Sequence, residues 1–321
     1  MRKLLIAIAT FAGIACAHAQ TYPTRPVTLV VPYPAGGPSD ALARILAETL
    51  RGTLGQTVVI ENVSGAGGAL GTGRVARAAP DGYTLSLGHV QTHVLNGALG
   101  TLGYDVVTDF EPVTPIADTP TWIAARGNFP AKDVKEMVAW MKANPGKATL
   151  GSVGVGGPGD IAAEYFRRHT GTTFQIVPYK GGAPLIQDLI SGQIDMTFGQ
   201  AANYLNPVRS GQLKAYAVLA AKRWWASPET PTIVEAGGPA LYSSFWHGLW
   251  VPKNTPKDVI AKLNAAVSQA LDDAVLKKRF SDIGQEIWPK DQQNPAALAA
   301  QQKAEIERWW PIIKEAGIKA Q

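Results

Sequence analysis

The sequence has little cysteine, no cluster of like charges and no long apolar run beyond its first residues, and each shortage excludes a class of protein. One cysteine, Cys16, occurs in 321 residues, which excludes intrachain disulfides and metal sites built from several thiolates. Thirty Lys and Arg and 25 Asp and Glu give a formal charge of +5, and these residues are scattered. Nucleic-acid binding usually requires a basic patch, so this class has no support.

The familiar catalytic motifs are also missing. The chain has no G-x-S-x-G, no H-E-x-x-H and no P-loop, so we predict that it is not an enzyme and carries no cofactor or metal. His89 and His93 have the spacing of a zinc protease, but Val90 stands where the glutamate is needed. Residues 154–159 fit the dinucleotide pattern G-x-G-x-x-G, but the next predicted strand ends without the acid that binds a ribose.

The first 19 residues have the features of a secretory signal. Arg2 and Lys3 precede an apolar stretch at residues 4–15, which is too short to span a bilayer. Residues 17–19 (Ala-His-Ala) fit the small-x-small cleavage pattern. We predict cleavage after Ala19, which places a soluble protein in the periplasm. That cleavage would remove the only thiol and lower the formal charge from +5 to +3.

Cys16 raises the alternative of a lipid anchor. A lipoprotein signal places its cysteine after a Leu-x-Ala or Leu-x-Gly pattern, whereas Gly-Ile-Ala precedes Cys16 here. The match is poor, so we expect no lipid anchor.

Strand and helix patterns alternate in two series beyond the signal. Apolar runs predict strands at residues 27–31, 58–60, 84–87, 148–153, 174–177, 196–198 and 215–219. Helical spacing of apolar residues lies between them, and the tail from Pro256 is mostly helical. This alternation predicts an α/β fold with parallel sheets covered by helices, and a length of roughly 300 residues suggests two domains.

Two apolar, extended stretches flank the second series, at residues 121–125 and 245–251. If both are connections, the second unit is inserted in the first, and two crossing strands form a hinge between two lobes. We therefore predict lobe 1 at residues 22–124 and 248–321, and lobe 2 at residues 125–247.

Short motifs follow one another over nearly the whole chain after the signal. They are PYPAGGPSD at 32–40, ENVSGAGG at 61–68, PDGYTL at 80–85, GSVG at 151–154, VPYKGG at 177–182, DLISGQID at 188–195, PTIVEAG at 231–237 and GLWVP at 248–252. Each is weak alone, but together they are specific. The chain resembles the Bug-type receptors, the periplasmic substrate-binding proteins of tripartite tricarboxylate transporters.

The resemblance implies a two-lobed periplasmic-binding-protein (Venus flytrap) fold with the ligand in the cleft between the lobes. It implies a small organic carboxylate as ligand and the membrane subunits of a tripartite tricarboxylate transporter as partners. We expect a monomer. Two alternatives stay open: a sensory binding protein that signals to a membrane kinase, and a secreted α/β enzyme.

Three glycine-rich loops are candidates for the ligand-binding site. In order of decreasing support, they are residues 33–39, 151–159 and 64–68. A helix N-terminus offers N–H groups without partners and a positive potential, and glycine lets the backbone come close to an anion. A strand-to-helix turn can also need glycine for its own sake. Three such loops together with the resemblance favour binding.

The candidate ligand-binding residues are Tyr33, Ala35, Gly36, Gly37, Ser39, Asp40, Gly67, Gly68, His89, Thr92, Ser152, Gly154, Gly157, Asp160, Lys180, Gly181 and Asp195. Several have a structural alternative. Asp40 can stabilise its own helix start, Asp195 can fix a loop of lobe 2, and Lys180 can be a solvated loop residue.

Asp160 departs from the family, because many relatives carry a histidine near the start of this helix. A carboxylate is a poor neighbour for a ligand carboxylate unless the ligand also has an amine. The ligand could therefore be an aliphatic, aromatic or amino acid. The Trp246-His247 pair is also bulkier than the small residues usual at that position.

Overall fold

The computed structural model describes residues 22–319 with the exception of residues 101, 154–155 and 180. The predicted signal with its cleavage after Ala19 therefore lies outside the described residues. The candidates Gly154 and Lys180 lie outside them as well.

The strands of the described chain are β1 (Val27–Val31), β2 (Val58–Asn62), β3 (Thr84–His89), β4 (Phe110–Asp118), β5 (Thr121–Arg126), β6 (Thr149–Val153), β7 (Gln175–Tyr179), β8 (Met196–Gln200), β9 (Leu213–Val218), β10 (His247–Pro252) and β11 (Glu286–Ile287). The α-helices are α1 (Pro38–Leu54), α2 (Ala69–Ala76), α3 (Asn96–Leu99), α4 (Val134–Ala143), α5 (Pro158–Thr170), α6 (Gly182–Ser191), α7 (Ala201–Arg209), α8 (Lys257–Asp272), α9 (Ala274–Asp282) and α10 (Pro295–Ala316). Short turns of other helical types are η1 (Ala66–Gly68), η2 (Gln91–Leu95) and η3 (Lys290–Gln292).

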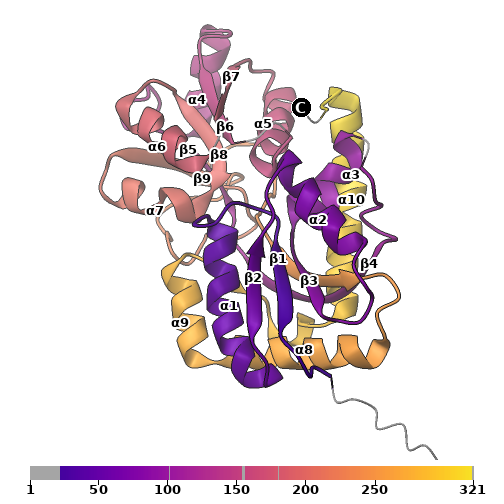
Figure 1. Cartoon of the computed structure of the whole chain (residues 1–321). Coiled ribbons are helices and arrows are strands. Elements are labelled where there is room, and N and C mark those ends of the chain that lie inside the picture. Colours follow the sequence, from indigo (N-terminus) through magenta and orange to yellow (C-terminus); the bar gives the residue numbers. More distant parts are fainter. Residues whose placement is uncertain (1–21, 101, 154–155, 180, 320–321) are drawn as a thin grey trace, which may run out of the picture.

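The strands form two sheets, one in each of two stacked lobes (Figure 1). Lobe 1 has the order β11-β4-β10-β3-β1-β2, in which β1 runs parallel to β2 and β3, whereas β10 is antiparallel to both β3 and β4. Lobe 2 has the order β7-β6-β8-β5-β9, with β6 parallel to β7 and β8. The predicted α/β, two-lobed fold is confirmed.

The crossings between the lobes differ from their predicted positions. The stretch 121–125 is not a connection but most of β5, which lies between β8 and β9 in the second sheet. The stretch 245–251 lies largely in β10, inside the first sheet. The chain crosses just before each strand, where Pro120 and Ser244 form an antiparallel bridge. Residues 121–124, which we assigned to lobe 1, therefore pair within the sheet of lobe 2.

Local sequence explains how β1 presents the first loop. All five residues of β1 are apolar or threonine, which suits a central strand with both faces covered. Gly37 then caps α1, with Pro38 at its first position, and Gly55 ends the helix in a left-handed conformation. The carboxyl end of β1 points toward lobe 2 in Figure 1, so the following loop lies between the lobes.

The lobes also share apolar contacts. One core cluster joins lobe 1 residues such as Val30 and Leu99 to lobe 2 residues such as Ile161 and Phe166. A second cluster packs α1 and α8 on the sheet of lobe 1. In the described part of the chain, no helix combines the length and apolar composition needed to cross a membrane.

Candidate functional site

Loop 1, defined as residues 33–40, joins β1 to α1 and is held by a single carboxylate. Gly36 has a φ of +80°, in the left-handed region that favours glycine. Its N–H donates to Asp40 Oδ2 at 2.8 Å, and Asn62 Nδ2 donates to Oδ1 at 3.0 Å. Arg44 Nε donates to Oδ2 at 2.8 Å from one turn further along α1. Asp40, which is 3% exposed, therefore fixes the loop, as its structural alternative predicted.

The charge of Asp40 is compensated inside loop 1. Burial by itself would raise the pKa of Asp40, but the hydrogen bonds from Arg44, Gly36 and Asn62 outweigh it and lower the pKa. The carboxylate is thus ionised at neutral pH and sits beside a guanidinium. Loop 1 consequently adds little net negative charge to the space in front of it.

The start of α1 supplies donors for an anion. Because Pro38 occupies the first helical position, Ser39 and Asp40 are the next two residues, and N–H groups at these positions have no acceptor within a helix. The positive end of the helix dipole adds to their potential. Ala35 and Gly36 are exposed at the tip of the loop. This geometry agrees with the predicted role of loop 1.

Loop 2, defined here by the described residues 156–160, repeats loop 1 in the other lobe. The sequences are Gly-Gly-Pro-Ser-Asp at 36–40 and Gly-Gly-Pro-Gly-Asp at 156–160. Gly156 has a φ of +77°, Gly157 caps α5, and Pro158 takes the first helical position. The Gly156 N–H donates to Asp160 Oδ2 at 3.2 Å, as Gly36 does to Asp40. Each lobe thus carries the same helix-start loop.

The two loops differ in charge compensation. Within the described residues, Asp160 makes no ion pair, and the residue one turn later is Glu164, which pairs with Arg167 and Arg168. Burial raises the pKa of Asp160 to about 6, although the hydrogen bond from the Gly156 N–H and the nearby Ser152 side chain counteract part of the shift. Asp160 can therefore take up a proton close to neutral pH, which Asp40 cannot.

A layer of neutral imidazoles lies behind loop 1. Ser39 Oγ and His247 Nε2 are 2.9 Å apart, and Tyr33 Oη lies 3.2 Å from His89 Nδ1. The rings of His89 and His247 are 4.8 Å apart. Burial lowers the pKa of His247 to about 4 and that of His89 well below its ordinary value. Both rings are uncharged at neutral pH and support the loop by hydrogen bonding and packing.

His247 was not among the predicted site residues. It lies 208 residues from Ser39 in the chain, so no local pattern connects the two side chains. The only sequence signal was the unusual bulk of the Trp246-His247 pair.

Loop 3, defined as residues 64–68, is shaped by close packing. A Cβ on Gly68 would lie 2.5 Å from Thr92 Cγ2, and Asn96 Nδ2 donates to the Gly67 carbonyl at 3.1 Å. Thr92 is fully buried, and its hydroxyl hydrogen-bonds the backbone of His89. Loop 3 is therefore joined to η2 through Gly67, Gly68 and Thr92. Close packing explains the glycines of this loop without a ligand.

The remaining candidates of lobe 2 separate into two groups. Ser152, buried near the end of β6, and Gly181, which caps α6, lie at the carboxyl ends of strands. Asp195 instead accepts hydrogen bonds from Thr149, at the start of β6, and from Arg126. Since loop 2 follows the other end of β6, these hydrogen bonds favour the structural alternative for Asp195, and its ligand contact stays a prediction.

Among the described residues, no metal-binding cluster accompanies these loops. In the part of the chain that the structure describes, no three His, Cys, Asp or Glu side chains gather to hold an ion. His93 stacks on Trp250, with ring centroids 3.9 Å apart.

Comparison with known proteins identifies the fold. BugT of Bordetella pertussis is 33% identical over 326 residues, covering 99% of both chains. The structure of MatC from Rhodopseudomonas palustris with bound malate has a TM-score of 0.83 and 38% identity, covering 91% of this chain and all of MatC. Another R. palustris structure, with adipate, has a TM-score of 0.84 and 34% identity, covering 93% and 99% of the two chains.

A family model described as the tripartite tricarboxylate transporter family receptor matches residues 42–318. The match begins within α1 and spans the whole sheet of lobe 2 and, apart from β1, the sheet of lobe 1. The resemblance drawn from short motifs is confirmed, and the chain belongs to the receptor family of the tripartite tricarboxylate transporters.

Proposed function

We propose that this receptor is exported with cleavage after Ala19, binds a small organic carboxylate between its lobes and delivers it as a monomer to the membrane subunits of a tripartite tricarboxylate transporter. The observation that carries the proposal is the repeated Gly-Gly-Pro-x-Asp loop, one copy in each lobe at the start of a helix. Each copy offers backbone donors and a positive helix end to an anion.

The pairing of the loops favours a ligand with two acidic ends. One helix start per lobe provides one anion position per lobe, and closure would place a short dicarboxylate between them. MatC was solved with malate and a second family structure with adipate, and both are dicarboxylates. We therefore rank dicarboxylates ahead of monocarboxylates and amino acids.

Asp160 is compatible with such a ligand. The concern that a carboxylate at this position repels an anion assumes that it is ionised, whereas burial raises its pKa to about 6. A nearby ligand carboxylate would raise this pKa further, so that Asp160 could bind a proton and donate a hydrogen bond. A ligand amine is then unnecessary.

Isothermal titration with malate, adipate, benzoate and glutamate tests the proposal. We expect binding of at least one dicarboxylate, with proton uptake that makes the heat depend on the ionisation enthalpy of the buffer. Failure of every acid in this panel to bind would overturn the proposed ligand class.

Gly37→Val provides the structural control for that titration. Gly37 has a φ of −81°, which valine can adopt, and a Cβ there would meet only the Pro34 carbonyl at 3.4 Å. The variant should fold with a loss of at most about 1 kcal/mol, because valine is a poorer N-cap than glycine, but should lose binding by at least about tenfold, equivalent to roughly 1.4 kcal/mol. Unchanged affinity in a folded Gly37→Val protein would show that loop 1 has only a structural role.

A further inference from the structure

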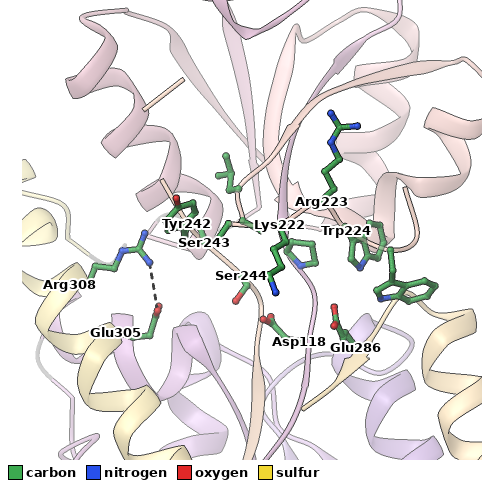
Figure 2. A pocket seen from close by; sticks show the side chains of 15 residues that line it. Asp118, Lys222, Arg223, Trp224, Tyr242, Ser243, Ser244, Glu286, Glu305 and Arg308 are labelled. Atoms are coloured by element: carbon green, nitrogen blue, oxygen red, sulfur yellow. Dashed lines mark ion pairs between the residues drawn. The ribbon is translucent and has the colours of Figure 1, made fainter. Parts of the chain in front are cut away.

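A cavity lies between the lobes, away from loops 1 and 2. It has a volume of about 420 Å³ and includes Asp118, Glu286 and Glu305 from lobe 1 and Lys222 and Trp224 from the segment between β9 and β10 (Figure 2). Both crossing segments contribute to its wall, through Pro120 and Ser244. The cavity therefore adjoins the hinge itself.

The lobe 1 wall carries two carboxylates in an unfavourable arrangement. Asp118 on β4 and Glu286 on β11 are directly opposite each other in the antiparallel register, and like charges in such pairs destabilise a sheet. Asp118 Oδ1 is buried and has no hydrogen-bond partner among the described residues. Burial, with a smaller contribution from the charges of Glu286 and Glu305, raises the pKa of Asp118 to about 7, although the nearby Ser244 side chain and Thr119 N–H counteract part of the shift. This pair needs a cation.

Three basic side chains line the cavity, and Lys222 is the one that is not in an ion pair with another described residue. Arg223 pairs with Glu235 at 2.8 Å, and Arg308 lies 3.9 Å from Glu305. Lys222 is exposed and makes no ion pair with any described residue. In Figure 2 its side chain reaches from the lobe 2 side toward Asp118 and Glu286. A small rotation of the lobes can therefore bring the ammonium to the carboxylates.

The order of the strands gives the direction of that rotation. In lobe 1, the strands β4 and β10 that lead to the crossings separate β11 from β1 and β2. Loop 1 follows β1 and the cavity adjoins β11, so the two lie on opposite sides of the crossings. Lobe 2 matches this arrangement, since β6 precedes loop 2 whereas β9 leads into the segment that carries Lys222. A rotation that separates the loops narrows the cavity.

We propose that Lys222 and the Asp118–Glu286 pair form a proton-sensitive latch that stabilises the open form of the receptor. Separation of the loops brings Lys222 to the acidic pair, whereas closure on a ligand withdraws it. The latch is strongest when Asp118 is ionised, above about pH 7, and weakens as the carboxyl takes up a proton. Acidification therefore favours closure, with Glu305, Arg308 and Arg223 as the other charged groups that face the cavity.

Inter-lobe distances in the ligand-free protein test the latch without reference to any ligand, so failure of the proposed function leaves the test valid. Val59 on β2 and Ile176 on β7 are 47% and 54% exposed and lie on the edge strands of the two sheets, on the loop side. Spin labels are attached at Val59→Cys and Ile176→Cys in a protein that also carries Cys16→Ala. Double electron–electron resonance then measures the distance between the two lobes.

At about pH 8, Lys222→Met should lower the ratio of open to closed molecules about two- to fivefold, the effect of a partly exposed ion pair. Glu286→Gln should act in the same direction. Wild type at about pH 6 should resemble Lys222→Met, and Asp118→Asn should remove this pH dependence. The matched control is Lys303→Met, which removes an exposed lysine that pairs with Glu307 on α10.

The proposal would be overturned if the inter-lobe distances changed neither with pH nor in Lys222→Met. A shift toward the open form in Lys222→Met would also overturn it. An equal response in Lys303→Met would do so too, because it would show a general effect of charge. If malate or adipate binds, its affinity at about pH 8 should also increase about two- to fivefold in Lys222→Met.

Discussion

Loops 1 and 2 have the same backbone and different electrostatics. In both, a glycine at positive φ donates its N–H to the aspartate four residues later, and a proline starts the helix. In loop 1 the aspartate has Arg44 and Asn62 as further donors, whereas in loop 2 the corresponding acid has no cation among the described residues. The pentapeptide determines the shape of the loop, and its neighbours determine the charge.

The difference suggests a division of roles between the lobes. Loop 1, with a compensated aspartate and a rigid hydrogen-bond network, presents a constant potential at any pH near neutrality. Loop 2 has an acid whose protonation state can respond to whatever binds in front of it. Each of the following changes alters one loop and leaves its counterpart as the reference.

The largest effect is expected from Asp40→Ala. This change leaves the Gly36 N–H and the Asn62 amide without an acceptor and the Arg44 guanidinium without its partner. Hydrogen bonds to charged groups contribute roughly 1.5–3 kcal/mol each, so we expect a loss of about 3 kcal/mol in the free energy of unfolding. Urea denaturation measures it, and a loss below about 1 kcal/mol would contradict the role assigned to Asp40.

The pentapeptide is also where the sequence was most informative. Glycine, proline and aspartate at fixed offsets predict a strand-to-helix turn from local geometry alone, and the apolar spacing of α1 predicts the helix. By contrast, β4 was not predicted, because Pro112 and Pro115 argue against a strand. The two-residue β11 leaves most of that edge of β4 open, and β4 pairs with β10 through register shifts, so the prolines are tolerated.

Non-local pairing accounts for the other differences between the sequence analysis and the structure. The stretch 121–125 has the composition of either a connection or a buried strand, and only its pairing with β8 and β9 decides between them. Asp195 follows a glycine turn as a loop residue would, but its partners Thr149 and Arg126 lie 46 and 69 residues away in the chain. Such contacts depend on the assembled sheet and leave no local signature.

Gly156→Ala should cost more stability than Gly36→Ala. Both positions have positive φ, which costs an L-residue roughly 1–2 kcal/mol. A Cβ on Gly36 meets nothing within 4 Å, whereas one on Gly156 would lie 2.7 Å from Leu99 Cδ1 in lobe 1. We expect losses of about 1 kcal/mol for Gly36→Ala and about 2–3 kcal/mol for Gly156→Ala.

Gly146→Ala provides the control for this comparison, since Gly146 has a φ of +71° and open space around it. It should match Gly36→Ala in urea denaturation. Equal losses at Gly36 and Gly156 would mean that Leu99 moves aside freely and that the lobes are not in firm contact there.

Asp160→Asn should stabilise the protein at neutral pH. Burial raises the pKa of Asp160 from 3.8 to about 6, so the folded protein holds this proton more tightly than the unfolded chain. The resulting stability is fully present below about pH 4 and is lost as the pH rises through about 6. The variant, which cannot ionise, should therefore gain up to about 2 kcal/mol over wild type at about pH 7.5 and nothing at about pH 3.5.

Denaturation of both proteins across this pH range isolates the contribution of Asp160, because all other groups are common to the pair. Asp40→Asn serves as the opposite case. The pKa of Asp40 is lowered in the fold, so its contribution is present at neutral pH and is lost on acidification. A gain in both variants at neutral pH would remove the electrostatic distinction between the loops.

The smallest effect on stability is expected from Arg44→Gln. This variant nevertheless tests the electrostatic difference between loops 1 and 2 most directly. Arg44 is more than half exposed, so solvent screens much of its attraction for Asp40. Without the guanidinium, Asp40 keeps its bonds to Gly36 and Asn62 but resembles Asp160 in lacking a cation, and the lowered pKa should rise. Carbon-13 NMR titration of the aspartate carboxyls measures this rise. A pKa of Asp40 that stays low in Arg44→Gln would show that backbone and amide donors alone set the charge of loop 1, and that the contrast with loop 2 arises from burial and not from the missing arginine.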